Sequence, residues 1–246
     1  MPRSARIKSK TGIYHIMIRG INRQNIFCDE EDYLKFLETL VRYKVVSEYK
    51  IYAYCLMTNH IHILIQPEKE DLDLIMKRIA GSYVYWYNLK YHRVGHLFQD
   101  RFKSEPVNDE NYFLTVVRYI HQNPLKANIV KNIKSYEYSS FNDYTNNYSY
   151  LTDIDFVLSM MSVEEFKQFN NEPNDDECLE YSVSYKLNDI DAKEMVKEIS
   201  GCVNADEFQK LESSDKDAFV SLFKEKGLSI RQICRLTGEK FSRVRK

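Results

Sequence analysis

Two short runs of β-branched and aromatic residues, Ile51 to Met57 and His60 to Gln66, are separated by only Thr58 and Asn59. A two-residue connection leaves the chain room only to turn back on itself, so the two runs predict an antiparallel β-hairpin. The second strand of this hairpin carries the sequence His60-Ile61-His62.

Further elements on both sides of the hairpin predict the rest of a sheet. In chain order they are a strand over Ile13–Arg19, a polar loop over 20–25, a helix capped by Asp29 and running to about Ser47, a helix from Asp71 to about Tyr91, a strand near Ser104–Val107, and a helix from Asp109 to Gln122 that Asn123-Pro124 stops. Strand, helix, strand, strand, helix, strand is the ferredoxin-like βαββαβ order, an antiparallel sheet with helices on one face. The sequence therefore predicts an α+β fold of this type with one added helix, followed by a small all-α C-terminal region.

The net charge of −1 over 246 residues hides a strong partition. Residues 1–150 sum to +5, residues 151–214 to −11 and residues 215–246 to +5. Two basic ends are consistent with a nucleic-acid partner, whereas the average charge is not. With the polar stretches after residue 145, this pattern predicts a domain over 1–145, an acidic linker and helical spacer over 146–214, and a basic tail over 215–246.

Composition excludes several classes of protein. The apolar runs are too short to span a membrane, and the first residues lack a signal peptide, so a cytoplasmic protein is expected. The five cysteines are scattered and odd in number, which predicts reduced thiols rather than a zinc or disulfide framework.

His60 and His62 lie two residues apart on a strand, so both imidazoles point to the same face. Two neutral imidazoles at this spacing can hold one divalent metal ion, although a hydrogen-bonded pair within the sheet gives the same pattern. A histidine-triad hydrolase is disfavoured because Leu64 stands where a third histidine is needed. The absence of a second His-x-Ser/Thr motif disfavours a two-histidine phosphoesterase.

The third predicted helix carries Tyr119 and Asn123 one turn apart, at the edge of an apolar stripe. Tyr119 could present its phenol to a metal-bound phosphate, and the amide oxygen of Asn123 could complete a metal site. Taken singly, the same residues are typical of helix packing and helix termination. Two imidazoles and an amide suit Mn²⁺, and Mg²⁺ is acceptable if water and phosphate oxygens supply its other ligands.

His60-Ile61-His62 and the stretch 119–124, Tyr-Ile-His-Gln-Asn-Pro, resemble the HUH transposases with a single catalytic tyrosine, in particular the REP-associated tyrosine transposases. Residues 18–24 and 97–103 support the resemblance, which spans about residues 3–145. It implies a catalytic domain that cleaves and rejoins single-stranded, hairpin-forming DNA. His60, His62 and Asn123 match the metal ligands, and Tyr119 matches the nucleophile that takes the 5′ phosphate.

Single-stranded DNA as a partner is also favoured by cations interleaved with aromatic rings, which bind phosphates and stack on bases. The residues expected to contact DNA in the first domain are Arg3, Arg6, Lys8, Arg19, Arg23, Arg101 and Lys103. Phe98 and Phe102 accompany them, although core packing gives the same pattern.

The tail resembles the helix-turn-helix tails of some members of the same transposase group. Residues 218–223 read as a helix that Gly227 ends, Ser229 caps the next helix, and Gly238 makes the turn. Ser242, Arg243 and Arg245 are expected to face DNA.

The sequence thus predicts a metal-dependent DNA transposase, using Mg²⁺ or Mn²⁺, that acts through a 5′-phosphotyrosine. The alternative is a non-catalytic DNA-binding or regulatory protein on the same fold. A monomer with a complete site and a homodimer that exchanges Tyr119 both fit the sequence.

Overall fold

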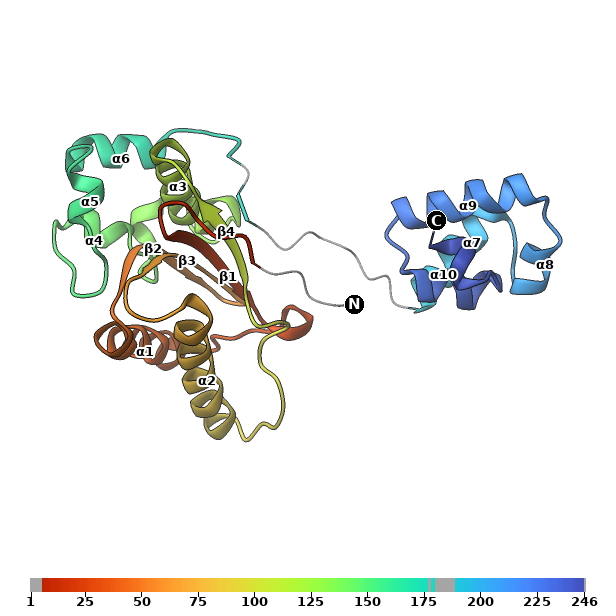
Figure 1. The fold of residues 1–246 in the computed structure, drawn as a ribbon, viewed down its shortest axis with the longest axis horizontal. Coiled ribbons are helices and arrows are strands. Elements are labelled where there is room, and N and C mark those ends of the chain that lie inside the picture. The colour runs from red at the N-terminus through yellow and green to blue at the C-terminus, as the bar shows by residue number, and fades with distance from the viewer. Residues whose placement is uncertain (1–5, 177, 180–188, 246) are drawn as a thin grey trace. The chain divides into compact units, whose positions relative to one another are not determined.

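The computed structural model describes residues 6–176, 178–179 and 189–245, which form two compact units, residues 1–180 and 181–246 (Figure 1). The elements of the first unit are β1 (Ile13–Arg19), η1 (Ile21–Arg23), α1 (Glu30–Ser47), β2 (Tyr49–Met57), β3 (His60–Pro67), α2 (Leu72–Lys90), β4 (Lys103–Val107), α3 (Glu110–Lys126), η2 (Ile133–Ser135), α4 (Phe141–Thr145), α5 (Asp155–Leu158) and α6 (Val163–Asn171). Those of the second are α7 (Asp189–Ser200), α8 (Ala205–Gln209), α9 (Ser213–Glu225), α10 (Ile230–Thr237) and α11 (Phe241–Val244).

The sheet has the strand order β2-β3-β1-β4, and every neighbouring pair is antiparallel. The predicted ferredoxin-like arrangement is therefore confirmed, and the C-terminal region is helical as expected. The hairpin is also confirmed, because Met57 pairs with His60 across the turn at Thr58 and Asn59. Asp29 caps α1 as predicted, and α2 and α3 begin directly after Asp71 and Asp109, where their starts were predicted.

The two faces of the sheet are covered by different helices (Figure 1). Ile16, Ile18 and Ile63 point to the face on which α1 and α2 pack, while Leu64 points to the face under α3. Alternation along each strand produces this division. The added helix α3 thus lies across the sheet from the two helices of the ferredoxin-like core.

The predicted end of α3 is wrong, because the helix continues through Asn123-Pro124 to Lys126. A proline inside a helix removes one backbone hydrogen bond, and its ring clashes with the carbonyl four residues earlier. Here Pro124 is buried near the end of the helix, and the amide of Ala127 still donates to the carbonyl of Asn123 at 2.9 Å. We infer that burial of the last turn offsets the lost bond.

The boundary between the units falls near residue 180 rather than at the expected 145. Phe141, Tyr144 and Phe166 from α4 and α6 are buried with Val116 and Ile120 of α3 in one core. The segment looks polar in sequence because these aromatic residues are few and widely spaced.

The second half of the predicted spacer belongs to the helical second unit. Ala192, Val196 and Phe208 pack with Phe223 and Ile233 of the tail. Within this unit, the predicted helix over 218–223 extends over the whole of α9, and Ser229 and Gly238 cap α10 as expected.

Among the residues that the structure describes, no helix combines the length and hydrophobicity needed to cross a lipid bilayer.

Candidate active site

Strand register places the two predicted histidines on the sheet face that α3 covers. His62 pairs with Met17 and His60 pairs with Arg19 across the β1–β3 interface, while His15 pairs with Leu64. Residues directly opposite one another in antiparallel strands point to the same face. His15, Arg19, His60 and His62 therefore share one face with Leu64.

His62 is fully buried, and one of its ring nitrogens has a histidine partner. Its Nδ1 lies 3.0 Å from Nε2 of His15, while its Nε2 is buried and forms no hydrogen bond with the described residues. Burial is the main reason that the pKa of His62 lies well below its usual value, and burial lowers the pKa of His15 to about 3. Both rings are therefore neutral at pH 7, the form in which imidazole binds metal ions.

His60 is partly buried and held by its neighbour in the turn. Its Nδ1 lies 2.7 Å from the side-chain oxygen Oδ1 of Asn59, and its ring centroid lies 5.2 Å from that of His62. Because an amide oxygen only accepts hydrogen bonds, Nδ1 of His60 is the donor. In the neutral ring Nε2 then carries the lone pair that a cation needs.

Tyr119 extends from α3 onto this pair of strands and is 3% exposed. Its ring centroid lies 5.7 Å from that of His62 and 5.9 Å from that of His15, both in edge contact. Nζ of Lys126 lies 5.3 Å from the centre of the same ring. The structure thus brings Tyr119 next to His62, which is 57 residues away in sequence.

Asn123 is 8% exposed, and its Nδ2 donates to the backbone carbonyl of Tyr119 at 2.9 Å. This bond does not use Oδ1, the amide atom able to bind a cation. The neighbouring His121 has a structural environment instead, because its two ring nitrogens contact Asn170 at 3.0 Å and Ser140 at 2.8 Å.

Two predicted DNA-binding cations lie on the same face as the histidines. Arg19 is the strand partner of His60, and Lys103 is the strand partner of Met17 on the other side of β1. Partial burial, with Arg19 nearby, lowers the pKa of Lys103. Arg23 is exposed in η1, directly after β1.

Arg6 and Arg101 lie beside a cavity of about 790 Å³ between α2 and the loop 96–102. The guanidinium of Arg6 stacks on the ring of Phe102 at 3.5 Å and pairs with Asp73 at 3.1 Å, and Arg101 lines the cavity. Phe98 and Phe102 are 9% and 7% exposed, which supports core packing as their main role. Lys8 is exposed, and Arg3 lies outside the described residues.

The predicted DNA-binding residues of the tail lie in the second unit. Ser242 and Arg245 are exposed on and after α11. Arg243 is held within its own unit, because its Nε donates to Asp217 at 2.8 Å and its Nη2 donates to the carbonyl of Ser213 at 2.8 Å. Arg243 is therefore less available to DNA than the sequence indicates.

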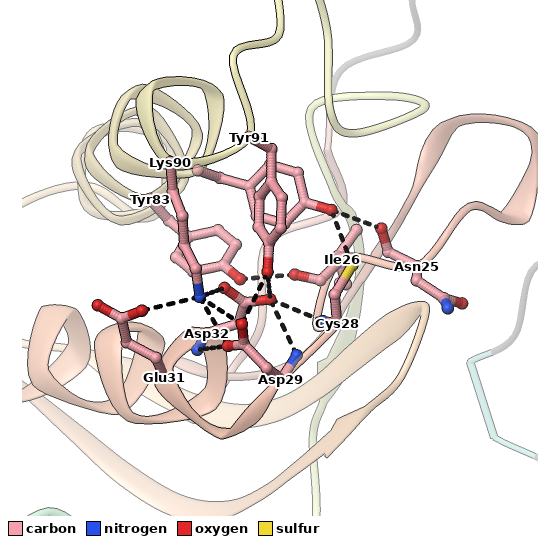
Figure 2. Close-up of polar contacts among 10 residues, drawn as sticks. Asn25, Ile26, Cys28, Asp29, Glu31, Asp32, Tyr83, Lys90 and Tyr91 are labelled. Carbon is pink, nitrogen blue, oxygen red and sulfur yellow. Dashed lines mark hydrogen bonds and ion pairs between the residues drawn. The ribbon is translucent and has the colours of Figure 1, made fainter.

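The loop before α1 joins the histidine turn to the rest of the fold. Backbone amides of Ile26 and Phe27 donate to the carbonyl of Thr58, and the amide of Gly20 donates to the carbonyl of Asn59. At its far end the loop is fixed to α1 and α2 by ion pairs and hydrogen bonds around the buried Asp32 (Figure 2).

The carboxylate of Asp32 is fully buried and accepts from the amide of Cys28 at 2.6 Å, from Lys90 at 2.9 Å and from the hydroxyl of Tyr91 at 2.8 Å. Lys90 also pairs with Asp29 at 2.6 Å. Loss of Lys90 would leave the buried carboxylate of Asp32 without its counter-charge, which is costly, so this pair helps to fix the loop on which the His60 turn rests.

His15 is the site residue that the sequence analysis missed. A lone histidine in a strand carries no motif, since His60 and His62 form a pattern by themselves. A signal was nevertheless available. His15 and Arg19 are an even number of residues apart on one strand, so their side chains point to the same face, and Arg19 was expected to contact DNA.

Residues 8–123, which include His60, His62, Tyr119 and Asn123, match the family model described as "Transposase IS200 like". The first unit belongs to the IS200-like transposase family. The family places it among the proteins of DNA transposition, as the sequence analysis expected.

One solved structure of a transposase has a similar fold. A REP-associated tyrosine transposase bound to a REP hairpin matches with a TM-score of 0.54 at 17% identity, covering 74% of this chain and 96% of that one. A candidate transposase from Deinococcus radiodurans R1 matches at 16% identity with a TM-score of 0.35, over 50% of this chain and 95% of that one. No curated protein sequence gives a significant match.

Proposed function

We propose that this IS200-like transposase is a metal-dependent enzyme that cleaves and rejoins single-stranded, hairpin-forming DNA, with Tyr119 as its nucleophile. The contact between the rings of Tyr119 and His62, with centroids 5.7 Å apart, is the observation that carries the proposal. Packing alone gives no reason for a tyrosine, two strand histidines and a neighbouring amide to meet on one face, whereas phosphoryl transfer uses all of them. Since both residues come from one chain, the proposal needs no tyrosine from a second copy.

The reaction is a transfer of one phosphodiester to the phenol. The oxygen of Tyr119 attacks the phosphorus and forms a 5′-phosphotyrosine, while the bond to the 3′ oxygen breaks and that oxygen takes up a proton. The phenol loses its own proton in this step. Because one ester replaces another, a 3′ hydroxyl can reverse the reaction and join strands without an external energy source.

The histidines fit the role of metal ligands. The buried Nε2 of His62 forms no hydrogen bond with the described residues, and His60 supplies a second imidazole on the same face of the sheet. A bound Mn²⁺ or Mg²⁺ would neutralise charge on the scissile phosphate and orient it. No group of three or more His, Cys, Asp or Glu in the described part of the chain is placed to hold a metal ion, so further ligands must be the Asn123 amide, water or phosphate oxygens.

An activating cation is needed because a free phenol has a pKa near 10. Besides the metal, Lys126 lies beside the ring of Tyr119 and contributes positive charge there. Arg19 and Lys103 follow the same face at the edge of the histidine pair and are proposed to bind the phosphates that flank the cleaved bond.

Hairpin DNA is proposed as the substrate because the REP-associated relative was solved bound to a REP hairpin. Arg6, Arg23 and Arg101 are proposed to bind the single strand next to it, and the apolar cavity beside Arg101 offers room for unpaired bases. In the tail, Ser242 and Arg245 are proposed to contact DNA through a helix-turn-helix-like arrangement of α10 and α11.

Incubation with Mn²⁺ and a panel of single-stranded hairpins tests the proposal. The wild type is expected to form a covalent protein–DNA adduct, whereas Tyr119→Phe is expected to bind the same DNA without forming one. Tyr112→Phe is a suitable control, because Tyr112 lies on α3 and donates its hydroxyl to Glu105 rather than facing the histidines. Binding without any adduct from the wild type would favour the non-catalytic alternative.

The histidine pair has a separate prediction. Replacing both His60 and His62 with alanine is expected to lower strand cleavage by at least about 100-fold, because metal-dependent charge stabilisation is lost. DNA affinity in a gel-shift assay without metal should change less than about threefold, since Arg19 and Lys103 remain. An equal loss of affinity would instead assign the pair a structural role.

A further inference from the structure

His15 lies outside the His-x-His motif, yet it is the direct partner of His62. It is fully buried on β1, and its Nε2 lies 3.0 Å from Nδ1 of His62. Its ring also contacts the edge of Tyr119, with centroids 5.9 Å apart. His15 therefore touches both a proposed metal ligand and the proposed nucleophile.

One hydrogen atom is shared between the two imidazoles, and its position decides what His62 can bind. If the hydrogen resides on Nδ1 of His62, the buried Nε2 of that ring carries a lone pair. If it resides on Nε2 of His15, the neutral His62 ring carries its own hydrogen on Nε2 and cannot bind a cation there.

No other hydrogen bond from the described residues fixes the position of this hydrogen between His15 and His62. Nε2 of His62 and Nδ1 of His15 are both buried, and neither forms a hydrogen bond with the described residues. Within that part of the chain, the hydrogen bond between the two rings thus determines which ring nitrogen of His62 carries the hydrogen. Metal-binding histidines commonly donate their second ring nitrogen to a fixed acceptor, which holds the ring in place and raises its basicity.

We propose that His15 is a positioning residue that accepts the hydrogen of His62 Nδ1 and thereby presents the lone pair of His62 Nε2 to a divalent cation. This inference rests on the metal site of the proposed function. It adds the requirement that an acceptor be present at the place that Nε2 of His15 occupies.

Three substitutions at His15 separate this role from simple packing. His15→Gln can place an amide oxygen near the position of Nε2, His15→Asn carries the same amide on a side chain one carbon shorter, and His15→Leu has no acceptor. Mn²⁺ binding to the DNA-free full-length protein, followed by electron paramagnetic resonance, is the readout. Thermal unfolding of each variant identifies any that fail to fold.

Mn²⁺ affinity is expected to fall about 10- to 100-fold in His15→Leu and His15→Asn and to remain within about fivefold of the wild type in His15→Gln. Equal affinity in the wild type and a folded His15→Leu would overturn the inference, as would equal losses in the Gln and Asn variants.

A His62→Ala control distinguishes failure of this inference from failure of the proposed function. Suppose that the wild type binds Mn²⁺, that His62→Ala does not, and that His15→Leu binds it with unchanged affinity. The metal site is then supported, and the proposed role of His15 is wrong. If the wild type itself does not bind Mn²⁺, the metal dependence in the proposed function fails, and the inference fails with it.

Nuclear magnetic resonance of histidine-labelled protein with Mg²⁺ locates the shared hydrogen directly. A coupling across the hydrogen bond, with the hydrogen on Nδ1 of His62, is expected. A hydrogen on Nε2 of His15 in the Mg²⁺-bound protein would contradict the inference even if the affinities agreed with it.

Discussion

At the scale of single residues, buried neutral histidines are a recurring feature of the first unit. His121 is fully buried between Ser140 and Asn170, and burial lowers its pKa from about 6.5 to about 4. In the unfolded chain the same ring takes up a proton near pH 6.5. Folding stability that depends on the neutral ring is therefore complete above pH 6.5 and is lost as the pH falls towards 4.

We expect the free energy of unfolding to decrease between pH 6.5 and pH 4, with His121 contributing about 1.4 kcal/mol per pH unit. Urea denaturation at several pH values measures this slope. In His121→Gln the slope should be shallower by about that amount, although His15 continues to contribute in the same direction. Identical slopes in both proteins would show that the burial of His121 is not coupled to its protonation.

At the scale of elements, the turn that precedes His60 depends on the close approach of the β1–α1 loop. A Cβ atom added to Gly20 would lie 2.3 Å from the backbone carbonyl oxygen of Gln24, so the loop must move to admit one. By contrast, a Cβ at Gly81, inside α2, would have no atom within 4 Å.

These two glycines form a matched pair for thermal or urea unfolding. Gly20→Ala is expected to lower the free energy of unfolding by about 2 kcal/mol through backbone displacement. Gly81→Ala is expected to raise it by about 1 kcal/mol, because alanine is the better helix former. A neutral Gly20→Ala would mean that the loop does not have to approach Gly20 closely.

The same scale shows what sequence could predict. The order of strands and helices, the hairpin, the cap at Asp29 and the helix starts at Asp71 and Asp109 follow from local patterns that each element carries in its own residues. The continuation of α3 past Pro124 does not, because it depends on burial of its last turn by distant segments. His15 was missed for the same reason, since its role depends on a side-chain contact with His62, which is 47 residues away in sequence.

At the scale of the whole molecule, the described parts of the acidic stretch 151–214 pack into the two units. Its first part contributes Asp153 and Asp176, which pair with Lys44 and Arg118 of the first unit. Its later part packs in the second unit, where Asp189 pairs with Arg235. Acidic residues of this stretch thus form ion pairs in both units, and the charge partition gives a poor estimate of the domain boundary.

Asp153 illustrates the energetic consequence of this arrangement. Its Oδ2 accepts from Nζ of Lys44 at 2.6 Å and from the backbone amide of Ile51 at 2.8 Å, so it fixes the segment after α4 to α1 and β2. Asp153→Ala is expected to lower the free energy of unfolding by about 2 kcal/mol, because the amide of Ile51 loses its side-chain acceptor and Lys44 loses its ion-pair partner.

Glu164 is the control for Asp153. It comes from the same acidic stretch and pairs with Lys167, but its side chain is 82% exposed. Glu164→Ala is expected to change the unfolding free energy by less than about 0.5 kcal/mol in the same urea titrations. Equal effects of the two substitutions would contradict the view that the contacts of Asp153 stabilise the fold.

The central claim at this scale is that one tyrosine among 19 carries the DNA strand during the reaction. Proteolysis of the covalent adduct formed with Mn²⁺ and a single-stranded hairpin, followed by mass spectrometry of the DNA-linked peptide, tests it most directly. We expect the 5′ phosphate to be attached to the phenol of Tyr119. A phosphate on any other residue, or an adduct of unchanged yield in Tyr119→Phe, would contradict it.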